Sequence, residues 1–238
     1  MEAILSLRHI LVLCLLVALA ALGWVNWRDV SSRPQVRELT APTIFKQPAS
    51  FASLTFDPAS PPPDMPPLDP GESAECVSDF GANANVTGQT RRTDATHATL
   101  TVTQINVTLQ LNITIWVPTN VTQRVIDHEA GHRQISEYYY RTADKLARRI
   151  AASYMGQQVE ITGTDLNAES MKALKQMGSE ITEAYDKELN PEPTQLLYDS
   201  ITDHSRNDVV AQDAVDHALK NVSMEFRQTA SPEPSDPR

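Results

Sequence analysis

The sequence predicts an α+β domain in which N-terminal antiparallel β-strands precede a long helix and two further helices. Residues 99–116 alternate apolar and polar side chains almost without fault, which is the period-2 pattern of half-buried strands. Residues 120–155 repeat apolar side chains at helical spacing, and Gly156 follows them as a helix stop. Two later segments, about 165–189 and about 208–226, are also predicted helices.

The strand segment defines one face of the predicted core. Its alternation slips once, at Gln104, which predicts a bulge or a turn there. The apolar positions are Leu100, Val102, Ile105, Val107, Leu109, Leu111, Ile113 and Ile115.

The long helix has a predicted start and a predicted buried stripe. Asn120 followed by Gln123 is a capping-box pattern. The stripe at helical spacing consists of Ile126, Ile135, Tyr139, Ala143, Leu146 and Ile150.

The remaining segments divide the chain into four parts. Residues 1–30 are predicted to be a signal-anchor or transmembrane segment, and residues 31–75, which are rich in proline, a disordered tether. Residues 76–228 form the predicted folded domain, and residues 229–238 a disordered tail.

Two readings of the N-terminal segment stay open. The apolar run at residues 10–25 is longer than a signal-peptide core of roughly 7–15 residues and shorter than the ~20 residues of a membrane span. A small-residue site at Ala18 and Ala20 favours cleavage, whereas Trp24 and Trp27 favour an uncleaved anchor. More arginines follow the run than precede it, which by itself favours a cytoplasmic domain.

Composition excludes several classes of function. The formal net charge is -10 and the pI is about 5.0, which argues against a nucleic-acid partner. The two cysteines, Cys14 and Cys76, provide neither a disulfide framework nor a cysteine zinc site. Cys76 is expected to be a small buried residue.

The pentapeptide from His128 to His132 reads H-E-A-G-H and lies in the predicted long helix. Residues four apart lie on one helix face, so the two imidazoles can bind one metal ion, with Glu129 beside it as a base. This motif predicts a zincin-like fold and a zinc site. Gly131 is unfavourable inside a helix by roughly 1 kcal/mol relative to alanine, which suggests that another backbone packs closely there.

A catalytic zinc ion usually has three protein ligands, so one more is needed. His204 is the leading candidate because it lies in a predicted loop among acidic and hydroxyl side chains. A carboxylate of the second helix is the alternative, and the candidates are Glu169, Glu180 and Glu183.

Residues 99–208 resemble a bacterial domain family described as predicted secreted zinc-dependent proteases. The family shows H-E-x-G-H and a downstream Y-D-x-x-T-x-H-G. The chain matches the second motif at Tyr198, Asp199, Thr202 and His204, and departs from it at Ser205, where the family has glycine.

The resemblance implies a peptidase of the cell envelope. The domain would face the periplasm from the bacterial inner membrane, or be secreted if the N-terminus is cleaved. His128, His132 and His204 would bind Zn²⁺, and Glu129 would act as general base. Further expected roles are hydrogen bonding to an oxyanion by Tyr198 and orientation of a ligand by Asp199 or Asp203.

The expected substrate is a peptide or protein that adds to the edge of the strand segment 99–116. One alternative is a non-catalytic envelope module with a structural metal, closed by Asp208 or Glu180 as fourth ligand, or with no metal. A zinc-free interaction domain and hydrolysis of a non-peptide amide are the others.

Overall fold

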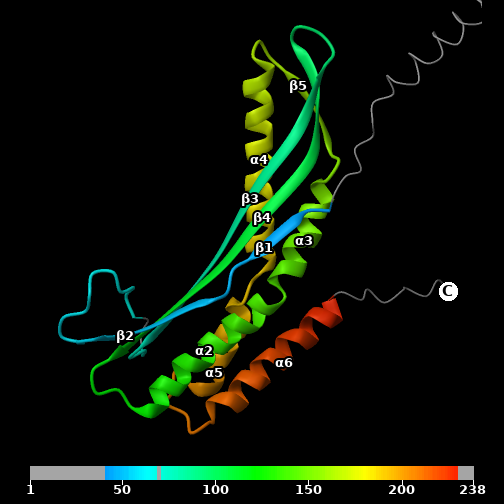
Figure 1. The fold of residues 1–238 in the computed structure, drawn as a ribbon. Helices are drawn as coiled ribbons and strands as arrows, with labels where there is room; N and C mark the ends of the chain where they lie inside the picture. The colour runs from blue at the N-terminus through cyan, green and yellow to red at the C-terminus, as the bar shows by residue number, and fades with distance from the viewer. Residues whose placement is uncertain (1–40, 69–70, 230–238) are drawn as a thin grey trace, which may run out of the picture. The chain divides into compact units, whose positions relative to one another are not determined.

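The computed structural model describes residues 41–68 and 71–229, with side chains as far as residue 222 (Figure 1). The chain divides into two units, residues 1–38 and 39–238, and all described residues belong to the second. The predicted anchor at residues 1–30, with Cys14, and nearly all of the predicted tail lie outside the described residues. Within the described ranges, no helix combines the length and the apolar character that a membrane span requires.

One long strand organises the sheet. β4 (His97–Pro118) pairs along one edge with β3 (Glu75–Arg92) and along the other edge with three short strands in turn. These are β5 (Gln158–Thr162), β1 (Thr43–Lys46) and β2 (Ser50–Phe56). Of these partners, β3 and β5 run antiparallel to β4, and β1 and β2 run parallel to it. The sheet is therefore mixed, and the purely antiparallel sheet expected from the sequence is wrong.

The two parallel strands also correct the predicted tether. β1 and β2 lie within residues 31–75, and Phe56 at the end of β2 is buried. Most prolines of that segment stand between residues 58 and 70, after the strands, so their density hid the short strand patterns before them. The folded domain accordingly begins before residue 76.

The predicted core face of the strand segment is confirmed. All eight apolar positions from Leu100 to Ile115 are buried in β4. The predicted irregularity is confirmed as well: Thr87 pairs with Gln104 but Gly88 pairs with Val102, so one residue of β4 bulges out.

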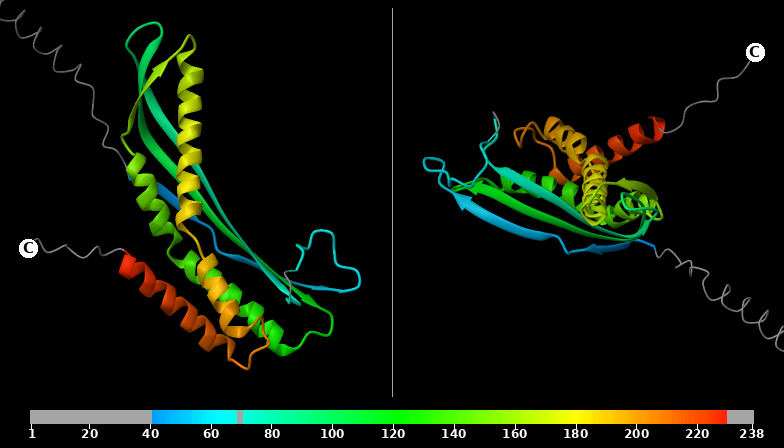
Figure 2. Two further views of the ribbon diagram at one scale, coloured as in Figure 1. Left: turned by 180° about the vertical axis from the view of Figure 1, so that it is seen from behind. Right: turned by 90° about the horizontal axis from the view of Figure 1, so that it is seen from above.

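Helices cover the sheet on one face (Figure 2). The segment predicted as one long helix is two, α2 (Gln123–Arg141) and α3 (Ala143–Tyr154). α4 (Leu166–Glu188) packs on β3, and α6 (Ala211–Thr229) packs against α2. An unpredicted helix, α5 (Glu192–Thr202), packs against α2 and α6.

A lysine of β1 forms hydrogen bonds at the break between α2 and α3. Thr142 leaves the helical conformation, which frees carbonyl groups of the last turn of α2. The Lys46 ammonium of β1 donates to the carbonyls of Tyr140 and Arg141, at 3.1 and 2.9 Å.

Two details of the predicted helix start are wrong. The residue before α2 is Thr122, which makes no side-chain cap, and Asn120 instead occupies a turn with φ of 65°. Ile126, expected in the buried stripe, is exposed.

Candidate metal centre

The first turns of α2 carry the predicted H-E-x-x-H residues. His128 and Glu129 are buried, and most of the His132 side chain is covered. The Nε2 atoms of the two histidines are 3.1 Å apart, as expected for side chains four residues apart on one helix face.

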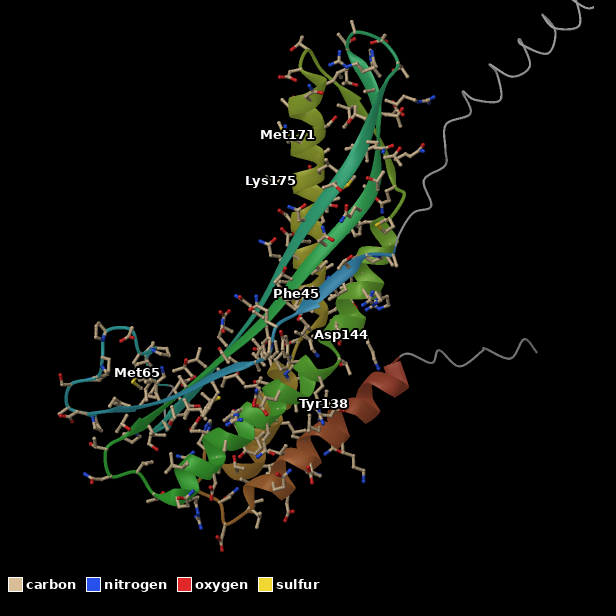
Figure 3. The ribbon with its side chains drawn as sticks, viewed as in Figure 1. Phe45, Met65, Tyr138, Asp144, Met171 and Lys175 are labelled. Atoms are coloured by element: carbon tan, nitrogen blue, oxygen red, sulfur yellow. The ribbon has the colours of Figure 1, made fainter. Side chains whose placement is uncertain are left out.

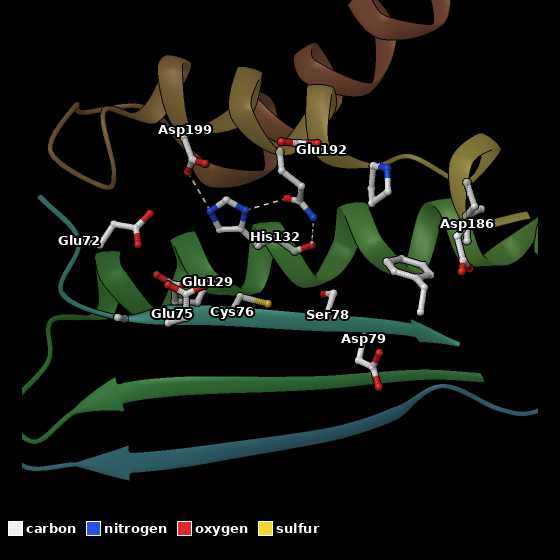
Figure 4. Close-up of a pocket in the computed structure, with 15 residues that line it drawn as sticks. Glu72, Glu75, Cys76, Ser78, Asp79, Glu129, His132, Asp186, Glu192 and Asp199 are labelled. Carbon is white, nitrogen blue, oxygen red and sulfur yellow. Dashed lines mark hydrogen bonds and ion pairs between the residues drawn. The ribbon is translucent and has the colours of Figure 1, made fainter. Parts of the chain in front are cut away.

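α5 brings Asp199 to this pair. Its Oδ1 atom lies 2.9 Å from Nε2 of His132 and 3.4 Å from Nε2 of His128 (Figure 4). Among the described residues, His128, His132 and Asp199 form the group whose ligand atoms lie close enough together to share one metal ion.

Gln195, one turn before Asp199 on α5, determines which nitrogen of His132 carries a proton. The Gln195 amide nitrogen donates to the carbonyl oxygen of His132 at 3.2 Å and to Oγ of Ser136 at 3.0 Å. The amide oxygen therefore faces Nδ1 of His132, 2.7 Å away, and accepts its proton. In the neutral imidazole, Nε2 then presents a lone pair to Asp199.

This arrangement fits a cation. A carboxylate oxygen and an unprotonated imidazole nitrogen repel at 2.9 Å unless a proton or a metal ion lies between them. Ligand atoms about 2.0–2.1 Å from a tetrahedral zinc ion are roughly 3.3 Å apart, close to the separations of these three atoms. Two nitrogen donors and one carboxylate oxygen are a donor set found for catalytic zinc.

The surroundings shift the pKa values of Asp199 and His132. Burial opposes ionisation of Asp199, but in the metal-free site the two adjacent histidines, when protonated, outweigh burial and lower the pKa of Asp199. Burial likewise opposes protonation of His132, but the contact with Asp199 and the charge of Glu129 outweigh it and raise its pKa.

Glu129 lies beside the triad. Burial, together with the nearby carboxylates Glu75, Glu72 and Asp199, raises its pKa to about 8, although His132 acts in the opposite direction. Without a cation this carboxyl group is therefore mostly protonated at neutral pH. A metal ion bound to the triad would lower that pKa and make Glu129 available as a base.

The triad opens into a cavity of about 560 Å³ between β3, α2, α5 and the end of α4 (Figure 4). Glu129, His132 and Asp199 line it, with Cys76 and Ser78 from β3 on the opposite wall. Cys76, expected to be buried, is only partly buried, and burial with the charge of Glu129 raises its pKa to about 12.

Tyr198 does not have the role expected from the sequence. It is fully buried, its ring stacks on His128 at 5.0 Å, and its hydroxyl donates to the carbonyl oxygen of His128 at 3.1 Å. The hydroxyl is thus occupied and cannot also serve an oxyanion. The ring explains Gly131, because a Cβ atom there would meet the Tyr198 hydroxyl at 2.2 Å. A side chain, rather than the expected backbone, packs against this glycine.

His204 lies beside the triad but outside it. Its Nδ1 atom is 3.9 Å from Oδ1 of Asp199 and 3.3 Å from a carboxylate oxygen of Glu72. Asp199, expected to orient a ligand, is instead grouped with the two histidines, and His204, expected to be the ligand, approaches the same carboxylate oxygen from outside that group. The chain leaves α5 through two left-handed residues, Asp203 and His204.

The other acidic candidates are engaged elsewhere. Asp203 pairs with Arg206 at 2.7 Å, so it does not orient a ligand. Asp208 pairs with Arg124, and Glu180 accepts a hydrogen bond from Gln176. Among the described residues, the group of side chains that could hold a metal ion includes none of these three residues. It also excludes Glu169 and Glu183.

The departure at Ser205 falls in a turn whose backbone conformation favours glycine. Asp203, His204 and Ser205 all have positive φ, and that of Ser205 is 68°. Glycine adopts this conformation without the steric cost that a side chain carries. We expect Ser205→Gly to raise the free energy of unfolding by about 1 kcal/mol, measured by urea denaturation. Ser73→Gly, outside this turn, is the control, and a Ser205→Gly protein that is less stable than the native chain would contradict this reading.

Sequence reasoning missed Gln195, Glu72 and Glu75. Gln195 shares one helix face with Tyr198, Asp199 and Thr202, so recognition of α5 would have revealed it. The two glutamates come from the segment assigned to the tether, and only the pairing of β3 with β4 brings them to the cavity.

Comparison with protein-family models, curated proteins and solved structures finds no match to this chain. The zincin-like fold and the family resemblance therefore stay predictions.

Proposed function

We propose that this protein is a zinc-dependent metallohydrolase that cleaves peptide bonds. The observation that supports this most strongly is the convergence of Nε2 of His128, Nε2 of His132 and Oδ1 of Asp199 beside a buried glutamate that lines an open cavity.

His128, His132 and Asp199 would hold the zinc ion, and Gln195 would keep His132 in the tautomer that binds it. Bound zinc supplies Lewis acidity, which polarises a carbonyl oxygen and makes a neighbouring water more acidic. His204, whose Nδ1 atom is 3.9 Å from Oδ1 of Asp199, would help to position that carboxylate.

Glu129 would transfer protons. Its carboxylate would take a proton from the attacking water and deliver it to the leaving amine. Its burial suits this task, because a pKa above the ordinary value makes the carboxylate a stronger base.

The cavity wall favours an extended substrate. β4, the strand expected to receive the peptide, has partners on both edges and cannot do so. β3 is the alternative, because within the described ranges no strand pairs with its outer edge. α4 covers the middle of this strand, where Gly178 approaches Ala84, but Glu75 to Phe80 line the cavity. A peptide could add to the sheet there, next to Glu129.

A structural metal site, the main alternative, requires a fourth protein ligand and exclusion of water. The two residues suggested for that position, Asp208 and Glu180, are engaged elsewhere. The open cavity beside the triad instead favours access by a substrate.

The proposal is tested by incubating the whole 238-residue chain, loaded with zinc, with a complex peptide mixture and identifying new termini by mass spectrometry. We expect cleavage that a chelator abolishes and added zinc restores. Zinc-loaded protein that produces no new termini, or cleavage that is indifferent to the chelator, would contradict it.

Zinc binding should weaken as the solution becomes acidic. Zinc competes with the proton on His132, and the raised pKa of this residue shifts the competition to higher pH. Zinc affinity is therefore full above that pKa and falls by about tenfold per pH unit below it, beginning above pH ~6.5. Titration with a competing chelator from pH 8 to pH 5.5 measures this.

The matched control is His97→Gln, which removes a distant exposed histidine and should leave the profile unchanged. Affinity that stays constant down to pH 6 would exclude His132 as a ligand.

A further inference from the structure

A buried serine next to the triad makes every hydrogen bond of which its hydroxyl group is capable. Ser136, one turn after His132 on α2, is 0% exposed. Its hydroxyl donates to the carbonyl oxygen of His132 at 3.1 Å and accepts from the amide nitrogen of Gln195 at 3.0 Å. A serine hydroxyl has one proton, so Ser78 of β3 is the donor in the third contact, at 2.7 Å.

These bonds determine how the amide group of Gln195 is oriented. Its nitrogen has two protons, which go to the carbonyl oxygen of His132 and to the hydroxyl oxygen of Ser136. A flipped amide would place an oxygen atom opposite that carbonyl, which only accepts, and opposite a hydroxyl whose proton is already donated elsewhere. The amide oxygen is therefore held toward Nδ1 of His132, at 2.7 Å.

Asp199 on the other side of the His132 ring favours the opposite tautomer. Its Oδ1 atom is 2.9 Å from Nε2 of His132 and would accept a proton from that nitrogen. A neutral imidazole has one N–H group, so Gln195 and Asp199 compete for the same proton. A proton on Nε2 would block the lone pair that a metal ion requires. The contacts that hold Gln195 in place therefore favour the tautomer that binds a metal ion.

We propose that Ser136 and Ser78 are positioning residues of the metal site, whose hydroxyl groups hold Gln195 so that His132 carries its proton on Nδ1. The inference rests on the proposed zinc-dependent function. It also gives β3 a second role. Ser78 lines the cavity within the stretch of β3 where a peptide could add, and Figure 4 shows it directed from β3 toward α2. The strand proposed to bind the substrate is thus connected by hydrogen bonds to a metal ligand.

A second buried serine has the same structural setting away from the metal site. Ser170 of α4 donates to the carbonyl oxygen of Leu166, four residues earlier, at 2.7 Å. It accepts from the hydroxyl of Thr90, which also belongs to β3, at 3.0 Å. Ser170→Ala therefore removes the same kinds of bond as Ser136→Ala. It is the matched control for effects on stability alone.

Zinc affinity of the whole chain, measured by competition with a chelator, tests the positioning role. Ser136→Ala should weaken zinc binding about fivefold, and Ser78→Ala about twofold, because each removes one support of the amide. Gln195→Leu should weaken it about 30-fold. Adding Ser136→Ala to Gln195→Leu should change the affinity by less than about twofold, since no amide is left to position. Unchanged affinity in Ser136→Ala, or an equal loss in Ser170→Ala, would overturn the inference.

Nuclear magnetic resonance of the histidine rings tests the inference without a metal ion. In the metal-free native chain, labelled with nitrogen-15, Nδ1 of His132 should carry a proton at pH 6 and also at pH 9. At pH 9 the proton should move to Nε2, which faces Asp199, in Gln195→Leu and in part in Ser136→Ala. Ser170→Ala should match the native chain. An unprotonated Nδ1 in the native chain at pH 9 would contradict the proposed role.

The two measurements distinguish this inference from the peptidase function. A native chain that binds no zinc, but has the expected proton on Nδ1 and loses it in the variants, would support the positioning of His132 and contradict the zinc-dependent function. Zinc-dependent cleavage, together with native zinc affinity in Ser136→Ala, would overturn this inference and leave the peptidase function standing.

Discussion

Replacing Glu129 with glutamine is expected to abolish turnover and to leave zinc bound. The amide keeps the size of the carboxyl group but cannot accept the proton of the attacking water. Loss of a general base reduces rates by about 10²–10⁴-fold, so kcat should fall by that factor while zinc content stays near the native value. A cleaved peptide quantified by mass spectrometry, beside metal analysis of the same sample, measures both.

The control for this change is Glu137→Gln, about two turns further along α2, where the carboxylate pairs with Arg133 away from the triad. Its kcat should remain within about twofold of the native value, since an exposed pair of this kind contributes little. A Glu129→Gln protein that retains most of its activity would show that another group is the base.

Replacing Gly131 with alanine is expected to produce the largest loss of stability. The new Cβ atom would lie 2.2 Å from the hydroxyl oxygen and 2.4 Å from Cζ of Tyr198. That ring is fully buried between His128 and His132 and cannot move without displacing them. Overpacking of this kind costs about 1–3 kcal/mol, and chemical denaturation of native and variant chains measures the difference.

A second substitution separates overpacking from other effects of alanine. Tyr198→Leu removes the atoms that clash, so adding Gly131→Ala to that background should cost at least about 1 kcal/mol less than it does in the native chain. Alanine has a higher helix propensity than glycine, so without the clash Gly131→Ala would stabilise α2. A loss of stability therefore indicates the clash with Tyr198. Equal costs in the two backgrounds would mean that Tyr198 is not the reason for the glycine.

The sequence alone predicted those structural features that depend only on neighbouring residues. The alternation of β4 fixes which of its residues are buried, and the slip at Gln104 marks the bulge, because side-chain period depends only on neighbouring residues. The spacing of His128 and His132 likewise predicts their proximity. The downstream motif pointed to Asp199, whose geometry favours a role as ligand over the expected role of orienting one.

Features that depend on distant contacts were not predictable in this way. Lys46, nearly a hundred residues before Arg141, binds the carbonyls at the break between α2 and α3.

α5 was missed for a local reason. Pro191 and Pro193 are typical of a loop, although proline is well tolerated in the first turn of a helix. The face of α5 that carries Gln195 therefore went unrecognised.

The extent of the folded domain has a practical consequence. A fragment beginning at Cys76 would lack β1 and β2, which cover one edge of β4, and would lose the contact between Glu72 and His204. Metal binding and activity are therefore measured on the whole chain.

The central claim is that His128, His132 and Asp199 bind one zinc ion. The most direct measurement is metal analysis by mass spectrometry of the whole chain, beside Asp199→Asn and His204→Ala, each dialysed against a weak chelator. We expect about one zinc ion per native chain. The His204→Ala protein should retain zinc, and the Asp199→Asn protein should bind it at least about 100-fold more weakly. A native chain without zinc, a native chain that selects iron, or an Asp199→Asn protein that holds zinc as tightly as the native chain would contradict it.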